Sequence, residues 1–185
     1  MHFTELPIRG AWTIDPSPHA DHRGRFFRAW CTNEFTALGI DFVPLQANIG
    51  TSRAAGTLRG LHYQAAPHDE AKLVRCTRGA VFDVLVDLRQ GSPTFGRWAG
   101  AELSAENARM LFVPRGCATG YQTLVDDSDI YYMTSAVYEP SAVRGLKFDD
   151  PSVGIEWPLP PTAISEQDSR WPSLQDHLSP LEAAR

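Results

Sequence analysis

Residues 56–64 read GTLRGLHYQ and decide how the rest of the chain is interpreted. The apolar residues of this stretch favour a strand, and Gly60 interrupts its layer of side chains. Arg59 and His62 stand three positions apart, so a regular strand would place them on opposite faces. A local twist or bulge, which glycine permits, would bring both side chains into one pocket. A surface arginine and a hydrogen-bonded core histidine remain the alternative interpretation of these residue types.

The flanking sequence predicts further strands. Residues 44–52 alternate apolar and amide side chains, which is typical of a half-buried strand. Residues 72–89 predict two strands joined at Arg78 and Gly79, and thus a hairpin. In the second of these strands the even-numbered residues are all apolar, so we expect that face to form the core. Residues 130–138 predict a strand rich in tyrosine.

Turn residues recur about every 8–12 positions along the chain, and helical periodicity is rare. Such a pattern predicts an all-β barrel or a two-sheet sandwich. Short helices are expected only at residues 33–38, 163–169 and 180–184. Residues 1–18 are rich in proline and predict either an edge strand or an arm that docks on a partner.

The composition fits one domain of an ordinary globular protein. The chain has 185 residues, of which 43% are hydrophobic and 21% are charged. Its formal net charge of -5 gives no basic field for nucleic acid. Because the sequence has no long apolar run and no secretory signal, we expect no membrane partner.

The three cysteines are odd in number and widely spaced. Cys31, Cys76 and Cys117 therefore indicate reduced thiols in a cytoplasmic protein rather than a disulfide framework or a zinc motif. Cys117 has two interpretations, a nucleophile or a small buried hydrophobic residue.

Several longer segments, read together, carry a resemblance to one family. They include, in order, LRGLHYQ (58–64), AKLVRCTRGAVFDVLVDLRQGSPTFGRW (71–98), LSAENARMLFVPRG (103–116), YEP (138–140), DDP (149–151), IEWP (155–158) and ISEQD (164–168). This set resembles the dTDP-4-dehydrorhamnose 3,5-epimerase family from about residue 21 to residue 172. The resemblance covers nearly the whole chain, so it is more specific than any one motif.

The resemblance implies a cupin, that is, an all-β jelly-roll barrel with a few short peripheral helices. Residues 1–185 would form one domain, with 1–20 as an N-terminal arm and 159–185 as a C-terminal extension packing on the barrel. It further implies a homodimer, a dTDP-linked 4-keto-6-deoxyhexose as substrate, and neither a cofactor nor a metal. The pathway stays open between dTDP-rhamnose biosynthesis and other deoxysugar biosynthesis.

The implied reaction inverts carbon 3, carbon 5 or both, next to the 4-keto group. Hydrogens on these carbons are acidic because the ketone stabilises an enolate. Inversion then needs a base on one face of the sugar, a proton donor on the other, and a donor for the enolate oxygen. The nucleotide diphosphate needs cationic partners, for which arginine is best suited.

The resemblance assigns catalytic roles to four residues. His62 matches the base, and Asp168 matches the carboxylate that orients this imidazole. Tyr132 matches the acid on the opposite face, and Lys72 matches a lysine beside the reacting sugar. Without the resemblance, Asp168 would be interpreted as a helix-capping or surface aspartate, Tyr132 as a packing residue and Lys72 as a solvated lysine at a strand end.

The expected substrate-binding residues fall into three classes. Arginines would hold the diphosphate, amides would contact the nucleotide, and aromatic rings would stack near the base. Core packing is the alternative for the aromatic residues, and ordinary solvation is the alternative for an arginine in a turn. The residues are the arginines Arg23, Arg59 and Arg115, the amides Gln46 and Asn48, and the aromatics Phe26 and Tyr138.

The sequence departs from the family pattern at a few positions. Thr119 stands where the family typically has a histidine. Its hydroxyl donates a hydrogen bond but neither takes up nor releases a proton at neutral pH, as a histidine can. We still expect Thr119 to line the substrate site. Arg28 replaces a usual glutamate, and Ile49 and Gly50 replace polar residues. These departures lead to the hypothesis of an active epimerase that differs in its sugar or inverts only one centre.

Three rival functions remain open at this stage. A metal-dependent cupin such as a dioxygenase needs clustered histidines, but His62 has no neighbouring histidine and Thr119 fills the later position. A non-catalytic nucleotide-sugar-binding cupin would bind the substrate without proton exchange. A ketoisomerase would relocate the carbonyl of the same substrate.

Overall fold

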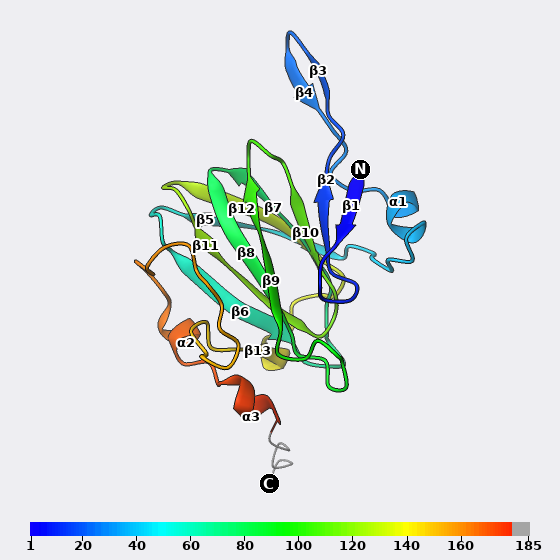
Figure 1. The fold of residues 1–185 in the computed structure, drawn as a ribbon. Coiled ribbons are helices and arrows are strands. Elements are labelled where there is room, and N and C mark those ends of the chain that lie inside the picture. Colours follow the sequence, from blue (N-terminus) through cyan, green and yellow to red (C-terminus); the bar gives the residue numbers. More distant parts are fainter. Residues whose placement is uncertain (179–185) are drawn as a thin grey trace.

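The computed structural model describes residues 1–178, which form two facing antiparallel β-sheets with short peripheral helices (Figure 1). The six-stranded sheet has the order β1 (His2–Glu5), β2 (Trp12–Asp15), β10 (Met110–Val113), β7 (Lys72–Arg78), β12 (Ser128–Thr134) and β5 (Gln46–Ser52). The five-stranded sheet has the order β13 (Val143–Gly145), β6 (Leu58–Gln64), β11 (Cys117–Thr123), β8 (Ala80–Asp87) and β9 (Trp98–Ser104). The predicted all-β jelly-roll class is confirmed.

The inward faces of the two sheets pack against each other and form the main core. The six-stranded sheet contributes residues such as Val74 and Ile130, and the five-stranded sheet contributes Val81 and Leu85. All four side chains are at most 5% exposed. This core fills one part of the space between the sheets and leaves the remainder for the cavity described below.

The hairpin predicted at Arg78 and Gly79 is wrong. The strand before this turn, β7, pairs with β10 and β12, whereas β8 pairs with β11 and β9 in the other sheet. The turn therefore carries the chain from one sheet to the other. A hairpin within one sheet and a crossover between two sheets can both consist of two strands around a short glycine turn. Only the pairing partners of the strands distinguish the two arrangements.

The even-numbered face of β8 forms core as predicted, but the odd-numbered face is buried as well. The even-numbered residues Val84 and Val86 pack outward beneath the C-terminal segment. The odd-numbered residues Val81 and Leu85 point between the sheets, and Asp83 shares this inward face. Both faces are buried, because the C-terminal segment covers the outside of the sheet.

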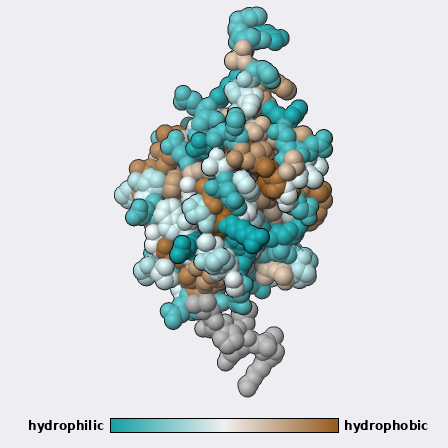
Figure 2. All heavy atoms as spheres, turned by 45° about the vertical axis from the view of Figure 1, so that its right-hand side comes forward, coloured by the Kyte–Doolittle hydropathy of each residue, from teal (hydrophilic) through white to brown (hydrophobic). Residues whose placement is uncertain are grey.

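The N-terminal segment divides into two parts. β1 and β2 form the edge of the six-stranded sheet, which was one of the two expected alternatives. β3 (His19–Asp21) and β4 (Gly24–Phe26) then form a separate hairpin that projects from the body (Figure 1). Figure 2 shows this hairpin as a narrow projection covered mainly by hydrophilic side chains, with apolar side chains gathered on the body beneath it. The hairpin contacts the body through Arg25, which donates to the Ala105 and Glu106 carbonyls.

The helices cover the outer faces of the two sheets. α1 (Thr32–Thr36) lies within the predicted region and contributes Phe35 to a core outside the six-stranded sheet. On the other side, α2 (Glu166–Ser169), α3 (Leu174–Leu178) and the 3-10 helix Pro140–Ala142 accompany the C-terminal segment. α3 was not predicted, and the predicted helix at 180–184 lies outside the described residues. Within residues 1–178, no helix combines the length and apolar character needed to cross a membrane.

Candidate active site

A cavity of about 670 Å³ opens between the two sheets next to the main core, which contributes Val74, Tyr121 and Ile130 to its wall. Its walls come from β5, β7 and β12 on one side and from β6, β8 and β11 on the other, and residues 163–168 close one edge. A second cavity of about 190 Å³ adjoins it and shares His62, Lys72 and Tyr132 with it. The combined space falls in the range that binds small molecules.

A bulge in β6 brings Arg59 and His62 to the same cavity. His62 is paired with Thr119 and Arg59 with Tyr121, so three steps along β6 match two steps along β11. The extra residue reverses the alternation of side chains between the two positions. Both residues line the cavity. The predicted bulge is therefore confirmed. Arg59 is exposed, as the alternative interpretation expected, but His62 is 40% exposed and is not a core histidine.

Glycine makes this bulge feasible. Gly60 has φ +118°, a conformation that L side chains rarely adopt, and a Cβ there would lie 2.6 Å from Gly120 Cα. The two strands thus approach each other backbone to backbone at this point. The glycine that interrupts the sequence motif is a structural requirement of the site.

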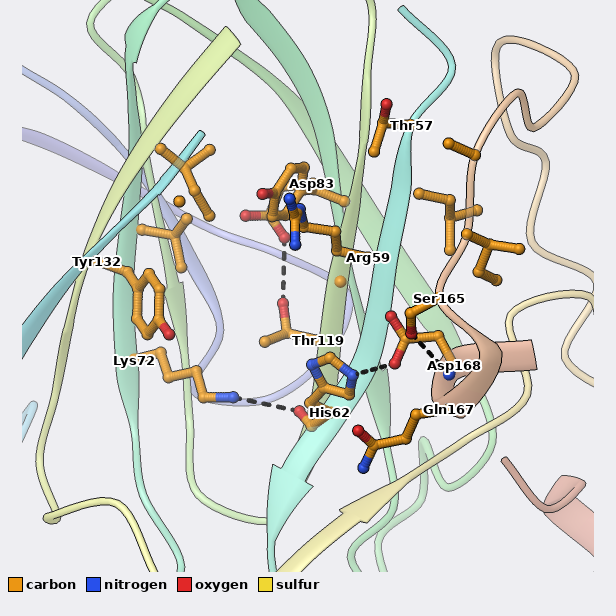
Figure 3. A pocket seen from close by; sticks show the side chains of 18 of the residues that line it. Thr57, Arg59, His62, Lys72, Asp83, Thr119, Tyr132, Ser165, Gln167 and Asp168 are labelled. Atoms are coloured by element: carbon orange, nitrogen blue, oxygen red, sulfur yellow. Dashed lines mark hydrogen bonds and ion pairs between the residues drawn. The ribbon is translucent and has the colours of Figure 1, made fainter. Parts of the chain in front are cut away.

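His62 is held by a buried carboxylate. Its Nε2 donates a hydrogen bond of 2.6 Å to Asp168 Oδ1, and the Asp168 side chain is 7% exposed. Because the carboxylate accepts at Nε2, the other ring nitrogen, Nδ1, keeps its lone pair and faces the cavity (Figure 3). The arrangement is that of an oriented general base.

Asp168 is itself fixed by several donors. Ser165 caps α2 by accepting from the Asp168 backbone N–H at 3.0 Å. The Asp168 carboxylate accepts from the Gly60 N–H at 3.2 Å and from Trp171 Nε1 at 3.1 Å. Burial alone would raise the pKa of Asp168, but its hydrogen bonds, first of all that from His62, outweigh burial and lower this pKa. Asp168 is therefore ionised at neutral pH.

Tyr132 and Lys72 stand on the wall opposite the His62–Asp168 pair (Figure 3). Burial raises the pKa of Tyr132, and the charge of Glu70 raises it further, so the phenol stays protonated at neutral pH. Lys72 Nζ donates to the His62 carbonyl at 3.2 Å and lies 3.1 Å from Glu70 Oε1. The cavity thus has a base on one side and a proton donor and a cation on the other.

Asp83 is a site residue that the sequence interpretation missed. It lines the cavity from β8, is 1% exposed, and accepts a hydrogen bond of 3.1 Å from Thr119. Burial raises the pKa of Asp83 to about 7, against the opposing effects of Thr119 and Lys72. An acidic residue in the middle of the apolar strand sequence VFDVLVD was the available signal. It was overlooked because only the even-numbered face of β8 was expected to form core.

Thr119 lies in the cavity wall as expected, and its hydroxyl is hydrogen-bonded to two groups of β8. Its hydroxyl donates toward the Val84 carbonyl at 2.8 Å as well as toward Asp83. Arg59 also lines the cavity and donates to Ser52 Oγ at 3.2 Å and to the Thr51 carbonyl at 3.1 Å. These two contacts hold the guanidinium in place.

The expected nucleotide-side amides line the second cavity. Gln46 Nε2 donates to Asn48 Oδ1 at 3.0 Å, and Gln46 Oε1 accepts from the Tyr138 backbone N–H at 3.0 Å. Tyr138 lines the same cavity and its side chain is largely exposed. These three residues form a connected rim next to Tyr132.

The remaining candidates do not reach the cavity of their own chain. Arg23 and Phe26 lie on the projecting hairpin, where Arg23 pairs with Asp21 at 2.6 Å and Phe26 is 77% exposed. Arg115 donates to the Asp69 carbonyl and lines a separate surface pocket. Arg28, expected to reverse a charge near the substrate, instead pairs with Glu34 of α1 at 2.8 Å. In the single chain, therefore, the departures at Ile49, Gly50 and Thr119 lie in the cavity wall, and the departure at Arg28 does not.

The described part of the chain offers no metal site. Within residues 1–178, no three histidine, cysteine, aspartate or glutamate side chains come close enough together to hold a metal ion. Cys117 is buried, and burial raises the pKa of its thiol to about 12. A thiol held neutral in this way is a packing residue and a poor nucleophile.

Comparison with known proteins agrees with this geometry. The family model for dTDP-4-dehydrorhamnose 3,5-epimerase matches residues 5–176. The chain belongs to this family. It is accordingly an isomerase of the sugar-nucleotide epimerase type.

Curated relatives include double and single epimerases. The dTDP-4-dehydrorhamnose 3,5-epimerase of Sinorhizobium fredii is 47% identical over 175 residues, which is 94% of this chain and 90% of the relative. The dTDP-4-dehydrorhamnose 3-epimerase of Streptomyces niveus is 37% identical over 169 residues, which is 91% of this chain and 81% of the relative.

Solved structures of the family have the same fold. The dTDP-4-dehydrorhamnose 3,5-epimerase from Elizabethkingia anophelis superposes with a TM-score of 0.91 at 37% identity, covering 95% of this chain and 97% of that one. The dTDP-6-deoxy-D-glucose-3,5-epimerase from Legionella pneumophila, solved in complex with dTDP-4-keto-L-rhamnose, gives 0.89 at 36% identity, covering 94% and 93%. The expected family membership is confirmed.

Proposed function

We propose that this chain epimerises a dTDP-4-keto-6-deoxyhexose at the carbons that flank its keto group. The observation that carries the proposal is the cavity in which the His62–Asp168 pair faces Tyr132 and Lys72. A space with a base on one side and an acid on the other can remove a proton from one face of a ring and return one to the other. Family membership and the dTDP-sugar bound by the Legionella relative support the substrate class.

The reaction begins with removal of a proton beside the ketone. In the proposed mechanism His62 Nδ1 takes the proton, and Asp168 stabilises the imidazolium that forms. The electrons of the broken C–H bond form the enolate, whose oxygen accepts a hydrogen bond from the Lys72 ammonium. Tyr132 then donates its proton to the opposite face of the same carbon, which inverts the centre.

The nucleotide is held by polar residues at the ends of the cavity. Arg59 is positioned to pair with the diphosphate, since guanidinium groups bind phosphate oxygens in a bidentate manner. The amides of Gln46 and Asn48 and the ring of Tyr138 are positioned for the remaining parts of the nucleotide. Binding energy at these remote groups orients the sugar ring between base and acid.

The decisive experiment incubates the protein with dTDP-4-keto-6-deoxyglucose in deuterium oxide and follows the sugar by NMR. Deuterium together with inverted configuration at carbons 3 and 5 identifies a double epimerase, and the same result at only one of them identifies a single epimerase. Binding without label at either carbon would overturn the proposal in favour of a non-catalytic nucleotide-sugar-binding protein. A carbonyl signal that moves to another carbon would overturn it in favour of a ketoisomerase.

We also propose that the protein acts as a homodimer in the cytoplasm. The β3–β4 hairpin projects from its own body, and the exposed Arg23 in its turn and Phe26 on β4 match residues expected to bind substrate. In a homodimer, the hairpin of one copy would reach the cavity of the other copy, since it does not reach the cavity of its own chain. The three cysteines are free, which agrees with a reducing compartment.

Mixing two variants tests the exchanged hairpin. His62→Ala removes the base and Arg23→Ala removes the proposed phosphate ligand, so each variant alone is expected to lose most of its activity. After the two are denatured and refolded together, hybrid dimers should regain about a quarter of wild-type activity, because half of the dimers then hold one intact site. A mixture as inactive as its components would contradict a site shared between two copies.

A further inference from the structure

Glu70 stands beside the catalytic residues although no part of the proposed reaction requires it. It precedes β7 and lines the second cavity together with Lys72 and Tyr132. Its side chain is 5% exposed, and its Oε2 is buried without a hydrogen-bond partner among the described residues. Burying an ionisable carboxylate with one oxygen unsatisfied is costly, which indicates that the charge serves the site rather than the fold.

The partner of Glu70 is Lys72. Glu70 Oε1 lies 3.1 Å from Lys72 Nζ, and the Lys72 side chain is 12% exposed. The same ammonium donates to the His62 carbonyl at 3.2 Å. An ammonium has three N–H donors, so these two contacts fix its orientation and leave one donor for a ligand in the cavity.

We propose that Glu70 is a positioning residue that holds the Lys72 ammonium with its free N–H directed at the keto oxygen of the bound hexose. The role rests on the proposed function, because it gives Lys72 a fixed place beside the enolate. A lysine side chain has four rotatable bonds, and an unanchored ammonium would lose much of its stabilising effect on the enolate through motion. Glu70 supplies the anchor from a position two residues along the same chain.

The charge of Glu70 also affects the second step of the proposed reaction, in which Tyr132 donates a proton. After burial, the carboxylate of Glu70 is the next cause that raises the pKa of Tyr132, followed by Tyr138. A neutral phenol is the form that donates a proton, so the buried charge extends the pH range in which Tyr132 is active. The other titratable or charged groups that line the two cavities with Tyr132 are Arg59, His62 and Tyr63 on β6, Lys72 on β7, Asp83 on β8, Tyr121 on β11, Tyr138 after β12 and Asp168 on α2.

Glu70→Gln tests the role, because it retains the size of the side chain and a carbonyl oxygen but removes the charge. We expect kcat for proton exchange to fall about 10- to 100-fold with KM changed less than about threefold. The alkaline limb of the kcat profile should move to lower pH, since the phenol of Tyr132 loses a neighbouring negative charge. Glu102→Gln, an exposed carboxylate on β9, serves as the matched control and should leave both quantities unchanged.

A double-mutant cycle separates positioning from a general structural effect. In a Lys72→Met background, Glu70→Gln should reduce kcat by less than about twofold, because the residue it anchors is gone. An equal loss of kcat in both backgrounds would show that Glu70 acts independently of Lys72 and would overturn the proposal. Tight dTDP binding by each variant, measured by calorimetry, confirms that the site is folded.

The outcomes for Glu70 and for the overall function are distinguishable. Wild-type protein that binds dTDP-4-keto-6-deoxyglucose without labelling it overturns the proposed function. Wild-type protein that labels the sugar, together with a Glu70→Gln variant of equal kcat and unchanged pH profile, overturns the role of Glu70 alone.

Discussion

His62 and Asp168 are joined by a hydrogen bond of 2.6 Å although they lie 106 residues apart in the sequence. The histidine comes from the bulged strand β6, and the aspartate comes from α2 in the C-terminal segment. The segment that carries Asp168 also covers the outer face of the five-stranded sheet through Leu174 and Val153. The orientation of His62 therefore depends on the packing of the C-terminal segment against the five-stranded sheet.

Replacing Asp168 should inactivate the base while leaving the fold intact. In Asp168→Asn the amide no longer fixes the Nε2–H tautomer and no longer stabilises the imidazolium, so we expect kcat to fall about 10³- to 10⁴-fold. Steady-state kinetics gives the loss, and circular dichroism checks the fold. Glu166→Gln on the same helix, an exposed carboxylate paired with Arg170, is the control and should retain full activity. A comparable loss in both variants would instead point to disruption of α2.

Replacing Tyr132 should separate proton removal from inversion. Tyr132→Phe removes the proton donor and leaves the His62–Asp168 pair unchanged, so epimerisation should fall about 10²- to 10⁴-fold. Exchange of the substrate proton with solvent on the His62 face should continue at a higher rate than inversion. Tyr131→Phe, the next residue and on the opposite face of β12, should behave as wild type. Loss of exchange and inversion to the same extent in Tyr132→Phe would contradict the assignment of separate base and acid.

The close approach at the β6 bulge predicts that replacing Gly60 there lowers the free energy of unfolding much more than replacing Gly24 in the β3–β4 hairpin. Gly60→Ala places a Cβ 2.6 Å from Gly120 Cα at φ +118°, and we expect it to cost about 3 kcal/mol or more in the free energy of unfolding. Gly24→Ala has a similar φ of +128° with nothing within 4 Å, so it should cost only about 1 kcal/mol. Urea denaturation measures both values. Equal costs would show that backbone strain, and not the close approach of β6 and β11, decides the requirement for glycine.

Local pattern and resemblance were sufficient for the β class and for the four predicted catalytic residues of the cavity. Glycine in the middle of a strand pattern correctly indicated a bulge, and the resemblance placed His62, Tyr132, Asp168 and Lys72 around one space. What the sequence could not show was which strands pair. The turn at Gly79 has the residues of a hairpin, but pairing is decided by contacts with distant strands such as β10 and β11.

The burial of the odd-numbered face of β8, which was not predicted, had a further consequence for the site. Because both faces of this strand are buried, apolar alternation could not tell the inside of the barrel from the surface beneath the C-terminal segment. Asp83 was therefore overlooked. Arg23 and Phe26 show the opposite difficulty, since motif matching names them as ligands while the single chain holds them away from its own cavity.

Two aspartates of β8 should affect stability with opposite pH dependence. Burial raises the pKa of Asp83 from 3.8 to about 7, so between these pH values the folded protein binds a proton that the unfolded chain releases. The stability that the protonated Asp83 contributes is complete below about pH 4 and is lost as the pH rises through about 7. Asp87 differs: burial alone would raise its pKa, but hydrogen bonds from Arg89, Ser92 and Thr94 outweigh burial and lower it. Its contribution is present above about pH 4 and is lost in acid.

Urea denaturation of Asp83→Asn and Asp87→Asn at several pH values checks this contrast. Relative to wild type, Asp83→Asn should gain on the order of 4 kcal/mol in the free energy of unfolding between pH 4 and pH 8, because the asparagine carries no charge to bury. Asp87→Asn should be most destabilising at neutral pH and less so as the pH falls below about 4, since wild type then loses the same interactions. Using the difference from wild type at each pH removes the contribution of every other titrating group. Parallel stability curves for wild type and Asp83→Asn would mean that Asp83 stays ionised in the folded protein at acidic pH, and the raised pKa would be wrong.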